Sequence, residues 1–251
     1  SFSLSGTDVE GDVLSYTVSL NPSQGVLSGT APNLIYTPTL GYIGPDSFQF
    51  TVNDGSENSL PATVSITVNP AGPNTIFWDD FETDQGWVRN PFGTDTARLG
   101  YWERANPDTV SYSGYKQLGT TVSGSYDLVT GPSAGSSAGS YDLDGGITSI
   151  QSPYFTLPTG RNLVLSLKYY MAHASNSSSA DYLRVKIVGT STQTILQELG
   201  ARNDDDAAWA TLSISLNTFA GQTVYLLIEA SDSPSESLVE AAIDDILIIA
   251  E

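Results

Sequence analysis

Two groups of carboxylates stand inside segments that are otherwise apolar. Asp80 and Glu82 flank Phe81, and Asp244 and Asp245 interrupt a run of alanines and isoleucines near residue 251. Burying an ionised carboxylate is costly unless a cation or hydrogen bonds compensate it. Asp80 and Glu82 point to the same side of an extended strand. If the two segments pair, their acids can share one Ca²⁺, because this cation prefers oxygen ligands. The alternative is a structural acid bonded to backbone amides.

A third acidic group lies near the beginning of the sequence. Asp8, Glu10 and Asp12 are spaced two apart along one side of a loop. A hard cation takes several oxygen ligands from such a turn, which would make this group a calcium clamp. Aspartates also cap the backbone of their own turns, and the residues alone leave both interpretations open.

Two tyrosines are candidates for ligand contact. Tyr112 and Tyr115 lie in a stretch rich in glycine and serine, so we expect them to be exposed. An exposed aromatic ring can stack on a sugar or anchor a protein partner. His173 is the only histidine, and H-E-x-x-H, G-x-S-x-G and phosphate-loop motifs are absent from the sequence. We therefore predict no catalytic site.

Composition excludes several classes of function. With 28 acidic and 9 basic residues, the net charge is −19. Such a field repels phosphate backbones, so nucleic-acid binding is not expected, and it attracts cations. Cysteine is absent, which excludes disulfides. No run reaches the roughly 18 apolar residues of a membrane span. The first residues already suggest a strand, so we expect a longer precursor whose targeting segment lies outside this sequence.

The elements that position these side chains are strands. Apolar and polar residues alternate with period two in segment after segment, and Gly, Pro, Asn and Asp clusters separate the segments. The pattern predicts an all-β chain of two sandwiches, a smaller one over residues 1–70 and a larger jelly roll over 76–251, joined by a Pro- and Gly-containing linker at 71–75. Strands are predicted around 14–18, 47–52, 63–68, 163–169, 182–188, 210–216, 224–229 and 245–249.

The first module resembles the immunoglobulin-like and cadherin-like tandem modules of bacterial surface proteins. The resemblance rests on GTDVEGDVLSYTV, on IYTPTLGYIGPDSFQFTVNDG and on ATVSITV, and it covers residues 1–70. It implies a β-sandwich that acts as a spacer or adhesive unit. The first strand of such modules is missing, which suggests truncation at the N-terminus.

The second module is similar to the MAM domain, an extracellular jelly roll, and to carbohydrate-binding modules. The resemblance rests on DFE at 80–82, LSLKYYM at 165–171, LRV at 183–185, a lone Trp209 and IDDI at 243–246. The cysteines usual in MAM domains are absent. The strings GYWER, SGSYDLVTG, DLDGG and LVEAAIDDI are also similar to C-terminal accessory modules of secreted bacterial peptidases.

These resemblances imply a structural calcium ion near DFE and IDDI. Carried over to this sequence, the best ligands are Glu82 with Asp244 or Asp245. Asp80, Asp127 and Asp142 are additional candidates. Such an ion would clip the first and last strands of the module together and add its binding energy to folding.

The sequence thus favours a non-catalytic, calcium-stabilised accessory region of a secreted or cell-surface bacterial protein, whose parent is a peptidase. An adhesin segment and a carbohydrate-binding module are the alternatives. The expected partner is an extracellular protein or polysaccharide, and the expected oligomeric state is a monomer.

Overall fold

The computed structural model describes the chain except for residues 1, 40–41, 43, 69–73, 134–137 and 234–236. It divides into two compact units, Ser1–Ala71 and Gly72–Glu251, so the division falls at the predicted linker. Most of that linker lies outside the described residues. The predicted all-β class is confirmed, since the described elements are strands and one short 3₁₀ helix. None of the helices in the described part is both long and apolar enough to span a membrane.

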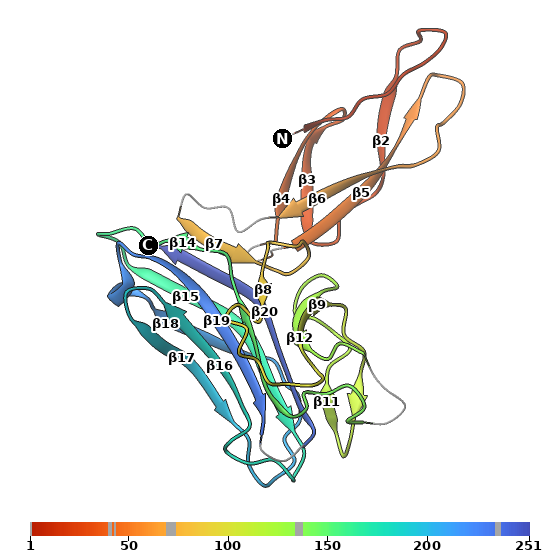
Figure 1. Ribbon diagram of the computed structural model, residues 1–251. Helices are drawn as coiled ribbons and strands as arrows, with labels where there is room; N and C mark the ends of the chain where they lie inside the picture. Colours follow the sequence, from red (N-terminus) through yellow and green to blue (C-terminus); the bar gives the residue numbers. More distant parts are fainter. Residues whose placement is uncertain (1, 40–41, 43, 69–73, 134–137, 234–236) are drawn as a thin grey trace. The chain divides into compact units, whose positions relative to one another are not determined.

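The first module contains two three-stranded sheets, β1-β4-β3 and β2-β5-β6 (Figure 1). Apolar residues alternate with exposed polar ones along these strands, so one face of each sheet is apolar. Those faces enclose a small core around Leu4, Leu34, Phe48 and Phe50. The strands are β1 (Phe2–Ser3), β2 (Ser15–Leu20), β3 (Gly25–Thr30), β4 (Asn33–Pro38), β5 (Gly44–Asn53) and β6 (Ala62–Val68).

One buried carboxylate links the two sheets of the first module. Asp46 on β5 accepts hydrogen bonds from the Tyr36 hydroxyl on β4 (2.8 Å) and from the backbone amides of Ser23, Gln24 and Ser47. Burial opposes ionisation, but these donors outweigh it and hold the pKa of Asp46 below its ordinary value. Asp46 therefore stays ionised without a cation.

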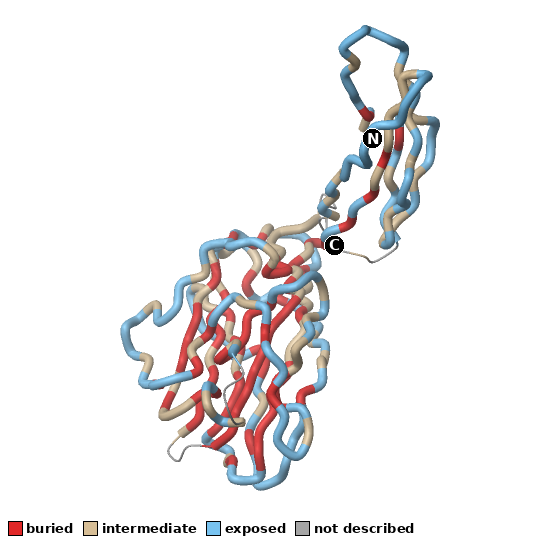
Figure 2. Tube along the Cα trace, turned by 90° about the vertical axis from the view of Figure 1, so that its right-hand side faces the viewer, coloured by how far each residue is buried: buried red, intermediate tan, exposed pale blue. Residues whose placement is uncertain are grey.

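The second module consists of two stacked antiparallel sheets. The first has the order β18-β15-β20-β12-β9, with β7 paired to β20, and the second has the order β17-β16-β19-β13-β8, with β14 paired to β19. Figure 2 shows the buried segments concentrated in their long strands. The long strands are β15 (Leu163–His173), β16 (Tyr182–Val188), β17 (Thr192–Leu199), β18 (Ala210–Ser215), β19 (Thr223–Asp232) and β20 (Val239–Ala250).

Shorter elements complete this module. They are β7 (Thr75–Asp79), β8 (Val88–Arg89), β9 (Trp102–Ala105), β10 (Val110–Ser111), β11 (Tyr115–Gln117), β12 (Asp127–Thr130), β13 (Gly146–Gln151), β14 (Phe155–Thr156) and the 3₁₀ helix η1 (Asn217–Phe219). The strand predicted at 245–249 begins six residues earlier, at Val239. The segment Val239–Ala242 is buried throughout, so it lacks the alternation that marks a half-exposed strand.

The sheet that contains β15 is covered on both faces. Met171 packs in the main core between the sheets, whereas its neighbours Tyr170 and Ala172 belong to a second cluster on the opposite face. We call residues 106–126, which contain β10 and β11, the strap. The Ala207 amide donates to the Tyr115 carbonyl of the strap (2.7 Å), and the Trp209 indole donates to its Thr120 carbonyl (3.4 Å). The outer face of this sheet is therefore an interior surface.

Candidate metal centre and ligand cavity

The first and last strands of the second module pair with each other, as the acidic segments require. β7 runs antiparallel to β20, with Asp79 opposite Ile246 and Trp78 opposite Leu247. This pairing places the acids that follow β7 beside those in β20. Asp80 interacts electrostatically with both Glu82 and Asp245, so the two groups lie close together.

The end of the strap binds both acidic groups. One oxygen of Asp244, Oδ2, accepts hydrogen bonds from the amides of Val122 (2.8 Å) and Ser123 (3.3 Å). Glu82 Oε1 accepts two more, from the amides of Ser125 and Tyr126, both at 2.7 Å. The strap therefore connects Glu82 to the last strand through its backbone.

Gly124 makes that close approach possible. It has a φ of +62°, and a side chain at this position would overlap the Glu82 carboxylate. The Ser123 hydroxyl donates to Asp245 Oδ1 (2.7 Å), and Asp245 itself has a φ of +49°. A non-glycine residue in this region indicates backbone strain held by its surroundings. The backbone conformation at Gly124 and Asp245 thus allows close contact with the carboxylates. The strand pattern in the sequence did not predict this local conformation.

Burial makes this group of acids hard to ionise. The pKa of Asp244 is raised to about 8, by burial first and then by the Asp245 carboxylate. Burial also raises the pKa of Asp80 and of Asp245. Lys168 is the cation that interacts with Asp245. The hydrogen-bond donors around Asp244 do not reverse the effect of burial, in contrast with those around Asp46.

The oxygen atoms of this acidic group are of the type that calcium binds. The group offers carboxylate oxygens from Asp80, Glu82 and Asp245 that accept no hydrogen bond from the described residues, together with nearby backbone. Calcium takes six to eight oxygens from carboxylates, carbonyls and water. Within the described part of the chain, however, no three Asp, Glu, His or Cys side chains converge as a group that could hold a metal. Any ion here would need carbonyl or water oxygens to complete its coordination.

Asp127 and Asp142 interact with other groups. Asp127 is fully buried, and neither of its carboxylate oxygens has a hydrogen-bond partner within the described part of the chain. Burial raises its pKa to about 8, and it lies near Tyr170, on the face covered by the strap. Asp142 interacts electrostatically with Asp144, Asp232 and Glu240. The structure therefore does not join these two residues to the group of Asp80, Glu82, Asp244 and Asp245.

A cavity of about 460 Å³ lies beside Asp142. Tyr112 lines it and is 53% exposed, as the sequence predicted, whereas Tyr115, 58% exposed, lies outside the lining. Polar and acidic side chains dominate the wall, and no lysine or arginine is among the described residues that form it. The lining residues are Tyr112, Ala138, Gly139, Asp142, Asp144, Ala174, Ser175, Asn176, Ser237 and Leu238.

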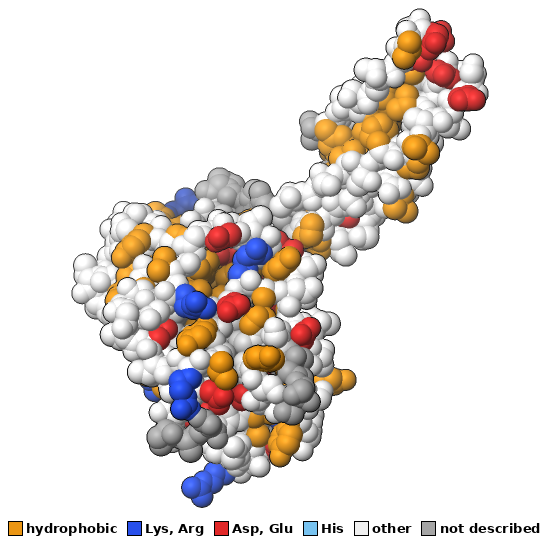
Figure 3. Space-filling view, turned by 45° about the vertical axis from the view of Figure 1, so that its right-hand side comes forward, with side chains coloured by type: hydrophobic (Ala, Val, Ile, Leu, Met, Phe, Trp, Pro, Cys, Tyr) orange, Lys and Arg blue, Asp and Glu red, His pale blue; other side chains and the backbone are white. Residues whose placement is uncertain are grey.

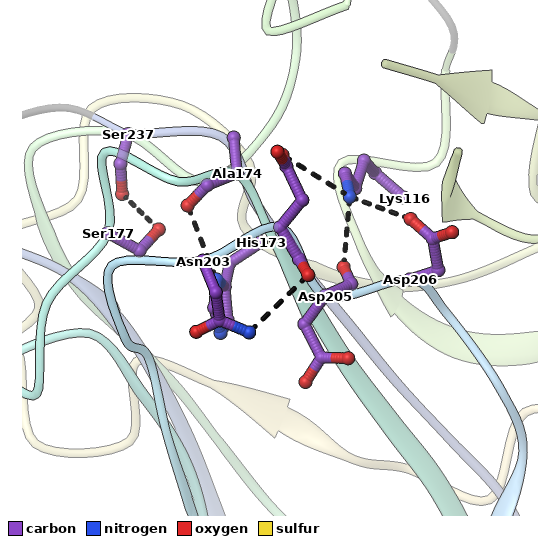
Figure 4. Close-up of polar contacts among 9 residues, drawn as sticks. Lys116, His173, Ala174, Ser177, Asn203, Asp205, Asp206 and Ser237 are labelled. Atoms are coloured by element: carbon purple, nitrogen blue, oxygen red, sulfur yellow. Dashed lines mark hydrogen bonds and ion pairs between the residues drawn. The ribbon is translucent and has the colours of Figure 1, made fainter. Parts of the chain in front are cut away.

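The strap is fixed near this cavity by a buried lysine that sequence reasoning missed. Lys116 on β11 is fully buried, and its ammonium donates to Asp206 Oδ1 (2.7 Å) and to the Asp205 carbonyl (3.1 Å) (Figure 4). Asp205 in turn pairs through its backbone with His173 at the end of β15. His173 is buried there, so the single histidine belongs to the strand end. The acidic run at 204–206 is the only sequence signal for this ion pair, and nothing in the sequence identifies Lys116 as the cation that it binds.

In the first module, the three predicted clamp residues lie in one loop. Asp8 Oδ1 accepts the Asp12 amide (2.8 Å), and Glu10 and Asp12 are exposed. Figure 3 shows acidic side chains at one tip of this module. Asp8 therefore acts as a backbone cap, and the calcium clamp stays a prediction.

Comparison with known proteins covers both modules. Residues 1–67 match the model of the bacterial Ig domain family, which accounts for the first module. No curated protein matches the chain.

Several solved structures are similar at low identity. The K1 cleaved adhesin domain of Lys-gingipain from Porphyromonas gingivalis is 14% identical, with a TM-score of 0.44, covering 70% of this chain and 99% of that one. The C-terminal family 22 carbohydrate-binding module of Clostridium thermocellum Xyn10B is 13% identical, with a TM-score of 0.42, covering 72% and 97%. Likeness at this level concerns β-sandwich architecture and says nothing of what this chain binds.

Proposed function

We propose that this chain is a non-catalytic binding region of an extracellular bacterial protein, and that its second module binds a polysaccharide in the cavity beside Tyr112. The observation that carries the proposal is the composition of that cavity. A half-exposed tyrosine stands next to carboxylates, hydroxyls and an amide, within a volume of about 460 Å³. Small-ligand sites typically enclose about 300–1,000 Å³.

The chemistry of the wall suits a neutral sugar. The Tyr112 ring offers an apolar face on which a sugar ring can stack. Asp142, Asp144 and Asn176 supply oxygens that accept hydrogen bonds from hydroxyl groups. Two carboxylates, within a chain of net charge −19, disfavour uronic acids and sulfated sugars. The favoured ligand is therefore an uncharged polysaccharide.

The test is a glycan array in calcium buffer, followed by affinity electrophoresis on the polysaccharides that bind. Tyr112→Ala should weaken binding about tenfold, taking about 1.4 kcal/mol for the lost stacking contact, which lies within the range of about 1–3 kcal/mol known for nucleic-acid bases on aromatic side chains. Tyr154→Ala is the matched control, because Tyr154 is 65% exposed but lies outside the cavity. An array without hits, or equal loss in both variants, removes the polysaccharide from the proposal.

We further propose that Ca²⁺ closes the second module at Asp80, Glu82, Asp244 and Asp245. The support is the β7–β20 pairing, the burial of Asp80 and Asp244, and the repulsion between neighbouring carboxylates, which Lys168 relieves only in part. Calcium bound at this position would neutralise the carboxylates. The β7–β20 pairing and the strap would hold the carboxylates in place around it. At a concentration 100 times its dissociation constant, an ion stabilises folding by about 2.7 kcal/mol.

All four tryptophans lie in the second module, so tryptophan fluorescence follows its unfolding alone. Calcium should raise that melting temperature relative to chelator, and Asp245→Asn should remove most of the rise. Glu103→Gln, which removes a half-exposed charge from the same module, should leave it intact. Equal melting temperatures with calcium and with chelator would count against the ion.

The parent protein is proposed to be a secreted peptidase that uses this region to engage substrate or a surface. The support is the resemblance of the strings at 100–104, 123–131 and 238–246 to accessory modules of such enzymes. The coding sequence around this chain tests it. A gene that encodes only repeated Ig-like modules would favour an adhesin instead.

A further inference from the structure

The segment Asp142-Leu143-Asp144 presents two carboxylates to one cavity. Leu143 is fully buried in the main core, and its amide donates to the Val239 carbonyl (3.2 Å). This anchor holds the segment in place between Asp142, which lies in a bend, and Asp144, which forms an isolated bridge with Leu99. Both residues line the cavity beside Tyr112.

Asp142 is buried in a way that its protein partners do not explain. Asp142 is only 3% exposed, and although the Val239 backbone donates to its carboxylate, its Oδ1 atom has no hydrogen-bond partner among the described residues. Nearby Asp232 differs, since it is bonded to the amide and hydroxyl of Ser237 (3.0 and 2.8 Å). A buried, unpartnered carboxylate oxygen is costly, so the cavity lacks a group that would complete this site.

The charges around Asp142 indicate what that group is. Asp144, Asp232 and Glu240 all interact with it or with each other, and all are acids. Burial, together with Asp144 and Asp232, raises the pKa of Asp142 to about 7. Arg98 interacts with Asp144, but it does not line the cavity. A positive charge inside the cavity would relieve this repulsion.

We propose that the cavity binds a divalent cation through the carboxylates of Asp142 and Asp144, at a site separate from the β7–β20 group. Calcium is the chemical class that fits, because every candidate ligand is an oxygen. Asn176, Ser175 and Ser237 in the wall, with water, can complete the coordination. The site depends on the cavity alone and requires neither a saccharide nor calcium at the β7–β20 group.

The experiment is calcium titration of the chelator-treated full chain by calorimetry, with Tb³⁺ luminescence as a second reading. Tyr112 lies in the cavity wall and can act as an antenna for Tb³⁺ bound there. We expect the double variant Asp142→Asn/Asp144→Asn to lose one calcium equivalent and the Tyr112-dependent emission. It should keep the part of the calcium-induced rise in the melting temperature of the second module that comes from the β7–β20 group, because calcium bound at either site stabilises this module.

The β7–β20 variant Asp245→Asn should show the complementary pattern: it should lose most of the rise in melting temperature and keep both the calcium equivalent of the cavity and the Tb³⁺ emission sensitised by Tyr112. Glu103→Gln is the charge control and should change neither reading. If the double variant fails to fold, Asp144→Asn alone serves, because Asp144 is only partly buried. Unchanged calcium stoichiometry and emission in a folded Asp142 or Asp144 variant would overturn the proposal, whatever happens at the β7–β20 group.

Discussion

The two modules treat buried carboxylates differently. Asp46 in the first module accepts three amide donors and a tyrosine hydroxyl, and its pKa lies below the ordinary value. Asp127 in the second module accepts none, and its pKa is raised to about 8. Asp244 has several donors, yet its pKa is also raised to about 8, by burial first and then by the neighbouring Asp245 carboxylate.

The difference teaches that burial alone does not decide the charge of an acid. Donors that face one carboxylate keep Asp46 ionised. Burial without such donors, as at Asp127, or burial beside a second carboxylate, as at Asp244, favours a proton or a cation. Asp46 therefore needs no ion to stay charged, whereas the second module has carboxylates whose charge depends on the solution. The experiments below test this difference between the buried carboxylates of the two modules.

The largest effect is expected from Asp46→Ala. It leaves the Tyr36 hydroxyl and three amides without their acceptor between the two sheets. Unsatisfied buried donors cost about 1–3 kcal/mol each and are not additive, so we expect a loss of about 3 kcal/mol from the first module. Calorimetry records this transition, and tryptophan fluorescence does not. An unchanged first transition would show that the donors do not stabilise this module.

The pH dependence of the two modules should be opposite in chelator. Asp127, whose ordinary pKa is 3.8, holds a proton in the folded state up to about pH 8. Folding therefore takes up protons between these values, and the second module loses stability as pH rises through that window. Asp46 has a lowered pKa, so its contribution is present above 3.8 and lost as pH falls through its folded value.

Melting curves of the full chain from about pH 2 to about pH 9 measure both effects, because the Asp46 contribution is lost only below pH 3.8. Added calcium should flatten the decline of the second module, because a bound cation favours the ionised carboxylates. A second module whose melting temperature rises steadily from pH 4 to 8 in chelator would contradict the assigned protonation.

Asp127→Asn should have a smaller effect with the opposite sign to that of Asp46→Ala. The amide removes the ionisation that burial disfavours, so at pH 8 in chelator we expect a gain of about 1 kcal/mol. This corresponds to a rise of about 2–4 °C in the fluorescence melting temperature. At pH 4 the gain should vanish, since the carboxyl is then protonated. A loss of stability at pH 8 would instead favour a cation bound at Asp127.

The smallest effect is expected from Asp8→Ala. It removes an acceptor for the Asp12 amide in an exposed loop and should cost the first module less than about 1 kcal/mol. Calcium should not alter this cost if Asp8 is only a cap. A calcium-induced rise of the first transition, lost when Asp8, Glu10 and Asp12 are all replaced, would instead support the predicted clamp.

Strand periodicity predicted the all-β class, and the acids in apolar strands predicted that Asp80 and Glu82 would meet Asp244 and Asp245. Alternation is a local property of the sequence, whereas the meeting of the two acidic segments followed from the expected jelly-roll topology. The predicted extended strand through Asp80 and Glu82 is wrong, because β7 ends at Asp79 and the chain bends at the residues that follow. Asp142 could not be separated from that group, because only the fold shows which acids share a cavity. The burial of Lys116 was not foreseen either, since its partners lie about 90 residues away along the chain.

The pairing of β7 with β20 has a mechanical consequence. Thr75 lies opposite Ile249 at one end of this ladder, and Asp79 lies opposite Ile246 at the other. Tension applied at Thr75 and Ile249 would break the hydrogen bonds between β7 and β20 one after another from that end. Such sequential rupture requires less force than breaking all of them at once. The carboxylates that follow Asp79 lie at the other end of this ladder. An ion bound by them would therefore resist the final separation of β7 from β20.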